Sequence, residues 1–209
     1  MSGFSDEISE QVEEQFSVLN KLDIEYFEAR GIGEKNISAL SDDEVIGLKA
    51  KMNEYGIKVS SIGSPIGKIK LEDDFCSHFE LFKRVVRTAK MLEAKYIRIF
   101  SFYHDSKNDW TEQEREKVLI YLGKMIEYAK EQDVILLHEN EKDVYGDTIE
   151  RCVDLMQELY CSHFKAVFDP ANFVQCGQDT KKAYEALKPY IAYMHIEFYH
   201  KPRGRGIGQ

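Results

Sequence analysis

The chain has 209 residues, 43% of them hydrophobic, and a mass of 24.3 kDa, so its length allows one substantial core and predicts a single domain over residues 1–209. The formal net charge of -9 argues against nucleic acid as a partner, because proteins that bind phosphates carry a clustered basic surface. No run approaches the roughly 20 apolar residues that cross a bilayer. The chain starts with MSGFSDE, which is acidic where a signal peptide is basic. We therefore expect a cytoplasmic protein that does not contact a membrane.

Helical and strand patterns alternate along the chain. We expect a helix over residues 8–21, a strand over 24–29, a helix that opens with a capping box at Ser41 and Glu44 and ends at Gly56, and a strand over 58–62. The elements that follow are a helix over 74–92, a strand over 96–101, a helix over 111–131, a strand over 134–138, a helix over 147–160, a strand over 166–169, a helix over 180–187 and a strand over 191–196. Residues 201–209 are Gly-rich and basic, which indicates a loop.

This alternation predicts an α/β fold with parallel strands joined by right-handed crossovers. A closed barrel and an open doubly wound sheet both satisfy the pattern, and the period alone does not choose between them. The four cysteines, Cys76, Cys152, Cys161 and Cys176, are scattered and form no CxxC pair. Their spacing predicts reduced thiols rather than a zinc knuckle or a disulfide framework.

Three successive strands end in a potential metal ligand: Glu139, Asp169 and His195, which are 30 and 26 residues apart. In parallel α/β folds the carboxyl ends of the strands line the active-site face. Adjacent parallel strands lie about 4.8 Å apart, so these side chains can converge on one cation. Two carboxylates and an imidazole suit Mn²⁺, Co²⁺, Mg²⁺ or Zn²⁺. The alternative is that each residue is an ordinary polar strand terminus, with Asp169 merely starting a turn.

Five segments, spread over nearly the whole chain, carry a family resemblance. They are FSDE at residues 4–7, IEYFEARG at 24–31, LHENEK at 137–142, FDPAN at 168–172 and YMHI at 193–196. Together they resemble the xylose-isomerase-like TIM barrels, the superfamily of sugar phosphate isomerases and epimerases, inosose dehydratases and endonuclease IV (AP endonuclease family 2 type). The resemblance implies a (β/α)₈ TIM barrel that is incomplete here, with its first strand clipped and its last strand and helix absent.

In that family one divalent metal is typically held by Glu, Asp, His and a second Glu, which implies Glu139, Asp169 and His195 as the first three ligands. The fourth ligand has no counterpart, because it comes from the missing last strand. Family enzymes use the two metal-bound carboxylates to move a proton between substrate carbons. Glu139 is therefore the catalytic base that the resemblance leaves.

Three further residues are candidates for binding the substrate: Glu141, Asn172 and Arg98. Glu141 and Asn172 could equally be simple loop residues, and Arg98 could instead form an ion pair or face solvent. His138 directly precedes Glu139 in a strand. We therefore expect it to point away from the metal face and to pack against a helix.

The function expected from these residues is a divalent-metal-dependent isomerase or epimerase that acts on a small sugar or polyol, directly or as its phosphate. The alternative is a catalytically inactive barrel remnant with a weakened metal site. An endonuclease IV-like enzyme would need further metal ligands and a basic DNA groove, which this chain lacks. An open seam would expose apolar surface at a cost of roughly 2.5 kcal/mol per 100 Å², so we also expect a homo-oligomer.

Overall fold

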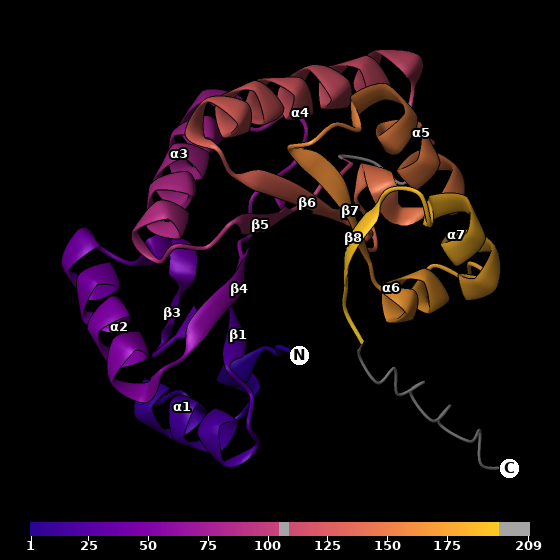
Figure 1. Ribbon diagram of the computed structural model, residues 1–209. Coiled ribbons are helices and arrows are strands. Elements are labelled where there is room, and N and C mark those ends of the chain that lie inside the picture. The colour runs from indigo at the N-terminus through magenta and orange to yellow at the C-terminus, as the bar shows by residue number, and fades with distance from the viewer. Residues whose placement is uncertain (105–108, 197–209) are drawn as a thin grey trace, which may run out of the picture.

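The computed structural model describes residues 1–104 and 109–196; the loop predicted for residues 201–209 lies outside them. Six strands form the main sheet: β1 (Tyr26–Ala29), β4 (Lys58–Gly63), β5 (Tyr96–Ile99), β6 (Ile135–Glu139), β7 (Phe164–Phe168) and β8 (Ile191–Met194). They are all parallel and lie in the order of the chain. Figure 1 shows the sheet curved into an arc with helices on its outer side. In the described part of the chain β1 and β8 remain the two edges, so the fold is an incomplete TIM barrel, as expected.

All six predicted helices are present. They are α1 (Val12–Lys21), α2 (Asp42–Tyr55), α3 (Phe75–Met91), α4 (Glu112–Gln132), α5 (Ile149–Leu159) and α7 (Thr180–Leu187). The capping box at the start of α2 is confirmed, because the Glu44 amide donates to Ser41 Oγ at 3.3 Å and the Ser41 amide donates to Glu44 Oε2 at 2.8 Å. Gly56 ends this helix in the left-handed conformation, with φ of 68°.

The predicted start of the first helix at residue 8 is wrong. A 3₁₀ turn, η1 (Ser5–Glu7), comes first, and Gln11 keeps an extended backbone with ψ of 116°, so α1 begins only at Val12. The strand patterns also missed a small hairpin of β2 (Gly31–Ile32) and β3 (Lys35–Asn36). A six-residue helix, α6 (Pro170–Gln175), and two further 3₁₀ turns, η2 (Ile37–Ala39) and η3 (Tyr145–Asp147), were missed as well. The other boundaries lie within two residues of the prediction.

Alternation along the strands divides the core into two parts. A small inner cluster of Ile135, Leu137 and Val167, packed by Tyr96 and Tyr193, lies inside the arc, and the larger cluster fills the space between the sheet and the helices. Because side chains change face at every residue, the next inward position on β6 after Leu137 is Glu139. The same alternation continues from Val167 to Asp169 and from Tyr193 to His195, which places these polar groups above the inner cluster.

His138 faces the helices, as predicted from its place next to Glu139. It lines a small void together with Cys152 and Met156 of α5, and its ring lies 6.2 Å from that of Phe164. Burial lowers its pKa to about 4, so this histidine is neutral near pH 7. His138 is therefore part of the packing and not of the candidate metal centre.

All four cysteines are free thiols, which agrees with the prediction. In residues 1–104 and 109–196 we find no helix that is both long enough and apolar enough to span a membrane.

Candidate metal centre

The structure brings Glu139, Asp169 and His195 together at the carboxyl ends of three neighbouring strands. Glu139 is the last residue of β6, Asp169 follows β7, and His195 lies just beyond β8. One ligand atom from each side chain lies within 4.8 Å of the other two, and all three residues are buried. The strand ends thus converge at a spacing that one cation could bridge.

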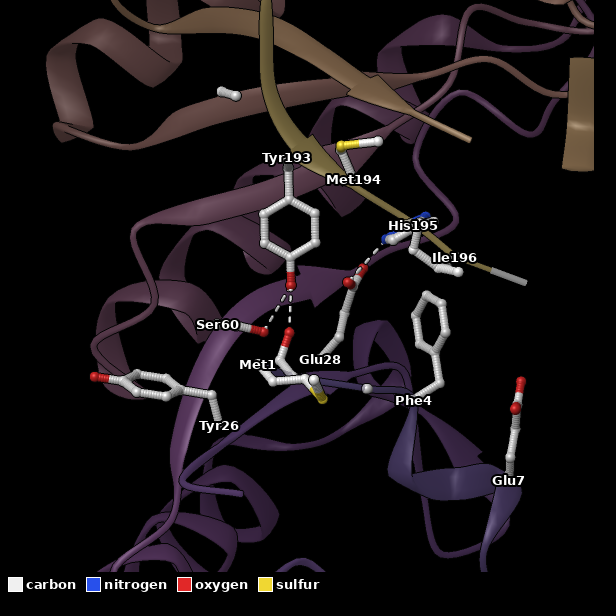
Figure 2. A pocket seen from close by; sticks show the side chains of 13 residues that line it. Met1, Phe4, Glu7, Tyr26, Glu28, Ser60, Tyr193, Met194, His195 and Ile196 are labelled. Atoms are coloured by element: carbon white, nitrogen blue, oxygen red, sulfur yellow. Dashed lines mark hydrogen bonds and ion pairs between the residues drawn. The ribbon is translucent and has the colours of Figure 1, made fainter. Parts of the chain in front are cut away.

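The imidazole of His195 lies between two carboxylates (Figure 2 shows the one from Glu28). Its Nε2 is 2.9 Å from Glu28 Oε2, and its Nδ1 is hydrogen-bonded to Glu139 Oε1. Burial alone would lower the pKa of His195, but the hydrogen bonds and charges of Glu139 and Glu28 raise it to about 10. In the protein without metal, His195 is therefore an imidazolium that donates from both ring nitrogens.

Glu28 was not among the site residues expected from the sequence. This side chain is only 2% exposed and comes from the end of β1, on the opposite side of His195 from Glu139. Its backbone amide donates to the carbonyl of Gly3 at 2.9 Å, which ties the start of the chain to β1. The signal was available, because alternation places Glu28 on the same inner face as Tyr26, at the carboxyl end of a strand.

Asp169 is held by the helix that follows it. Its Oδ1 accepts hydrogen bonds from the amides of Ala171 and Asn172 at 2.8 and 3.0 Å, so it is the N-cap of α6, and Pro170 occupies the first helical position. Asn140, a second residue that the sequence analysis missed, binds the Asp169 backbone on both sides: it donates to the carbonyl at 2.8 Å and accepts from the amide at 3.0 Å. The Asp169 carboxylate is thereby fixed in orientation.

Asn172, a candidate for substrate binding, lies in the same scaffold. Its side-chain amide donates to the Asn140 carbonyl at 3.0 Å, and its Oδ1 accepts from Gln175 at 3.2 Å. The first contact joins the loop after β6 to α6, and the second lies within α6.

The other two substrate-binding candidates form ion pairs at the same end of the sheet. The guanidinium of Arg98 is buried and lies 3.2 Å from Glu139 Oε2. Glu141 Oε2 accepts from the ammonium of Lys68 at 2.8 Å. Burial tends to raise the pKa of Glu139, but His195 and Arg98 hold it below its usual value. Glu139 is therefore an ionised carboxylate in the interior of the protein.

The charges of this centre fit a divalent cation. Glu28, Glu139 and Asp169 are at most 3% exposed, and Arg98 and His195 are at most 9% exposed. Three carboxylates against one guanidinium and one imidazolium leave one negative charge in excess, and a buried excess charge is costly. A divalent cation that displaces the imidazolium proton would balance the five groups. Carboxylate oxygens and an imidazole nitrogen suit Mg²⁺, Mn²⁺, Co²⁺ and Zn²⁺.

A cavity of about 1130 Å³ lies at the seam between β1 and β8 and reaches Glu28 and His195 (Figure 2). Tyr193 spans the seam, because its hydroxyl is 2.7 Å from Ser2 Oγ and donates to Ser60 Oγ at 2.9 Å. The ring of Phe4 lies 5.1 Å from that of His195. Side chains rather than backbone hydrogen bonds thus join the two edges, and the cavity gives solvent a route towards the centre.

No protein of curated function matches the chain in sequence, but solved structures share its fold. A probable 3-DHS dehydratase, AsbF, from Bacillus anthracis matches with 18% identity and a TM-score of 0.72, over 86% of this chain and 65% of its own. A xylose isomerase-like TIM barrel protein from Mycobacterium smegmatis, in complex with magnesium, matches with 13% identity and a TM-score of 0.75, over 93% and 73%. The D-psicose 3-epimerase of Clostridium cellulolyticum H10, with D-tagatose, matches with 15% identity and a TM-score of 0.73, over 93% and 72%.

At such low identities these likenesses show the fold alone, and the chain spans about two thirds to three quarters of the length of these proteins. The family is shown by a family model, the xylose isomerase-like TIM barrel, which matches residues 16–209. The match covers most of the chain, including the strand ends that bring Glu139, Asp169 and His195 together. The chain therefore belongs to the xylose isomerase-like TIM barrel family.

Proposed function

We propose that the protein is a divalent-metal-dependent isomerase or epimerase of a small sugar or polyol, taken directly or as its phosphate. The observation that carries this proposal is the convergence of Glu139, Asp169 and His195, whose ligand atoms all lie within 4.8 Å of one another. Structural neighbours described as epimerases, one of them with D-tagatose, support the substrate class. A neighbour in complex with magnesium supports the metal.

Glu139, Asp169 and His195 would hold the ion, which would act as a Lewis acid on a ketose carbonyl and its neighbouring hydroxyl. Glu139 is the general base of this proposal. Its carboxylate is ionised, because His195 and Arg98 lower its pKa, so it can accept the proton next to the carbonyl. Arg98, at 3.2 Å from Glu139 Oε2, orients that carboxylate. Glu28 orients His195 through the hydrogen bond to Nε2 at 2.9 Å.

Isomerisation and epimerisation differ in the number of protein groups that must carry a proton. An aldose–ketose isomerisation on one face of the substrate needs one base that takes the proton and returns it, which Glu139 can do alone. An epimerisation returns the proton to the opposite face and needs a second group there. Glu28 is a buried second carboxylate, and its Oε1 accepts no hydrogen bond from the described residues. It is therefore our candidate for that second group.

Proton exchange with solvent tests this proposal. We would incubate the Mn²⁺-loaded protein with a panel of ketoses and their phosphates in D₂O and follow deuterium at the carbons next to the carbonyl by NMR. Glu139→Gln removes the base while keeping the shape of the side chain, and Glu131→Gln, at an exposed position of α4, is the matched control. We expect exchange in the wild type and in Glu131→Gln, and a loss of at least about 100-fold in Glu139→Gln.

The second candidate is an inactive barrel remnant with a weakened metal site, and the open edge between β1 and β8, next to His195, favours it. Less than one equivalent of retained metal, together with no proton exchange of any substrate in the panel, would favour this second candidate over the enzyme. The cytoplasmic location and the homo-oligomer remain predictions. Light scattering tests the homo-oligomer, because association of copies would raise the mass above that of one chain.

A further inference from the structure

Lys68 lies in a hydrogen-bonded turn at the carboxyl end of the sheet. It lies in the loop between β4 and α3, which runs alongside the segment after β5: Phe100 donates its amide to the Ile66 carbonyl at 2.8 Å, and Phe102 donates to the Gly67 carbonyl at 2.9 Å. Gly67 has φ of 87°, and a Cβ there would lie 2.1 Å from the Phe100 carbonyl oxygen. Only glycine fits this close approach, so the path of the backbone next to Lys68 depends on Gly67.

The side chain of Lys68 stands at the boundary between the buried centre and solvent. Its Nζ lies 4.2 Å from the centroid of the Phe100 ring, and the Arg98 guanidinium lies 4.9 Å from the same ring. The side chains of Lys68 and Glu141 are 32% and 22% exposed. Lys68 is also within electrostatic reach of the metal centre, because its charge helps to lower the pKa of Glu139.

This ammonium has unused binding capacity. It offers three N–H donors, and among the described residues Glu141 takes one of them. A partly exposed ion pair contributes little to stability, so Glu141 can be displaced at small cost. Lys68 and Glu141 form a separate neutral pair outside the five buried groups that a divalent cation would balance. An incoming anion can therefore exchange with Glu141 without replacing a metal ligand.

We infer that the substrate of this site carries an anionic group, a carboxylate or a phosphate, which binds the Lys68 ammonium above the Phe100 ring in exchange for Glu141. The inference rests on the proposed function and narrows its substrate class to charged molecules. A neutral hydroxyl would need only a dipolar partner, whereas an ammonium against an aromatic face suits a full negative charge.

Two small anions test the inference directly. We would titrate Mg²⁺-loaded protein with inorganic phosphate and, separately, with acetate, and follow the backbone amide signals of residues 66–70 by NMR. Lys68→Met removes the charge, Lys68→Gln is a second neutral variant, and Lys68→Arg restores a cation. Lys130→Met is the matched control, because Lys130 is also a paired lysine, bound to Glu127 on the outside of α4. Thermal unfolding checks that each variant is folded.

We expect saturable shifts with at least one anion, and the anion that binds more tightly identifies the carboxylate or phosphate class. Lys68→Met and Lys68→Gln should weaken binding by about 10- to 100-fold, the size expected for one charged hydrogen bond, while Lys68→Arg and Lys130→Met retain it. If neither anion saturates, or if the neutral variants bind as well as the wild type, the inference is overturned. Metal content measured on the same samples reports separately on the proposed function.

Discussion

Replacing Glu28 by Gln removes one of the two charges that hold His195 as an imidazolium. The change keeps the size of the side chain and an oxygen that can accept from Nε2, now 2.9 Å from Glu28 Oε2. A nearby opposite charge shifts a pKa by about 1–3 units, and the amide of Gln keeps only the dipolar part of that interaction. The loss of the full charge therefore corresponds to a fall of about one pKa unit or slightly more, which is about 1–2 kcal/mol. We therefore expect the pKa of His195, about 10 in the wild type, to fall towards 9.

The assay is a pH titration of the imidazole signals of ¹⁵N-histidine-labelled, metal-free protein by NMR. The His195 signal is identified by its loss in His195→Asn. Glu25→Gln is the control, because Glu25 precedes β1 and is exposed. Metal affinity is a poorer readout of this variant, since the loss of an orienting partner lowers it while weaker proton competition raises it.

A His195 pKa that is the same in Glu28→Gln and in the wild type would refute the reasoning. It would mean that Glu28 does not act on the imidazole and that the buried arrangement of His195 has another cause. An equal fall in Glu25→Gln would assign the effect to long-range charge and not to the contact.

Three further predictions concern pH and packing. Metal binding displaces the proton of His195, whose pKa is about 10. The apparent metal affinity should therefore rise about 10-fold per pH unit between about pH 7 and 9. Calorimetry in two buffers should show about one proton released per metal ion, and no release would contradict the displacement of the His195 proton. His138 has a pKa of about 4 in the folded protein and of about 6.5 in the unfolded chain. The stability that the neutral side chain of His138 contributes is therefore complete above about pH 6.5 and falls by about 3 kcal/mol as the pH drops to about 4. Urea unfolding should show this loss in the wild type and a flatter profile in His138→Leu. Gly67→Ala should destabilise the protein by about 2–4 kcal/mol in the same assay, because its Cβ would lie 2.1 Å from the Phe100 carbonyl oxygen; unchanged stability would show that the turn can yield.

The order of strands and helices could be predicted because local patterns determine it, whereas a barrel rather than an open sheet was expected only from the family resemblance. Each strand is a short apolar run, each helix has a periodic face, and the caps at Ser41 and Gly56 have the conformations that their residue types favour. The short helix α6 was missed because six residues are too few to show a helical period. Its start signal was nevertheless present, since Asp169 followed by Pro170 is a favourable N-cap and first position.

The candidate centre was only partly predictable, for a different reason. Glu139, Asp169 and His195 are each the polar end of a strand, so chain order and parallel pairing suffice to place them together. The contact between Glu28 and His195 joins the first and last described strands of the sheet, and no local pattern reports how an open arc brings its edges together. Lys68 depends on the path of the loop after β4, which follows from hydrogen bonds to residues 100–103 that are distant in sequence.

The most direct test of the central claim is the metal content of the purified protein after loading with Mn²⁺, Co²⁺ or Zn²⁺ and dialysis. The double variant Glu139→Gln/Asp169→Asn removes two of the three converging ligands while keeping their shapes. We expect about one equivalent of metal to remain with the wild type and to be lost from the double variant. No retained metal in the wild type, or equal metal in both proteins, would contradict the assignment of these strand ends as a metal centre.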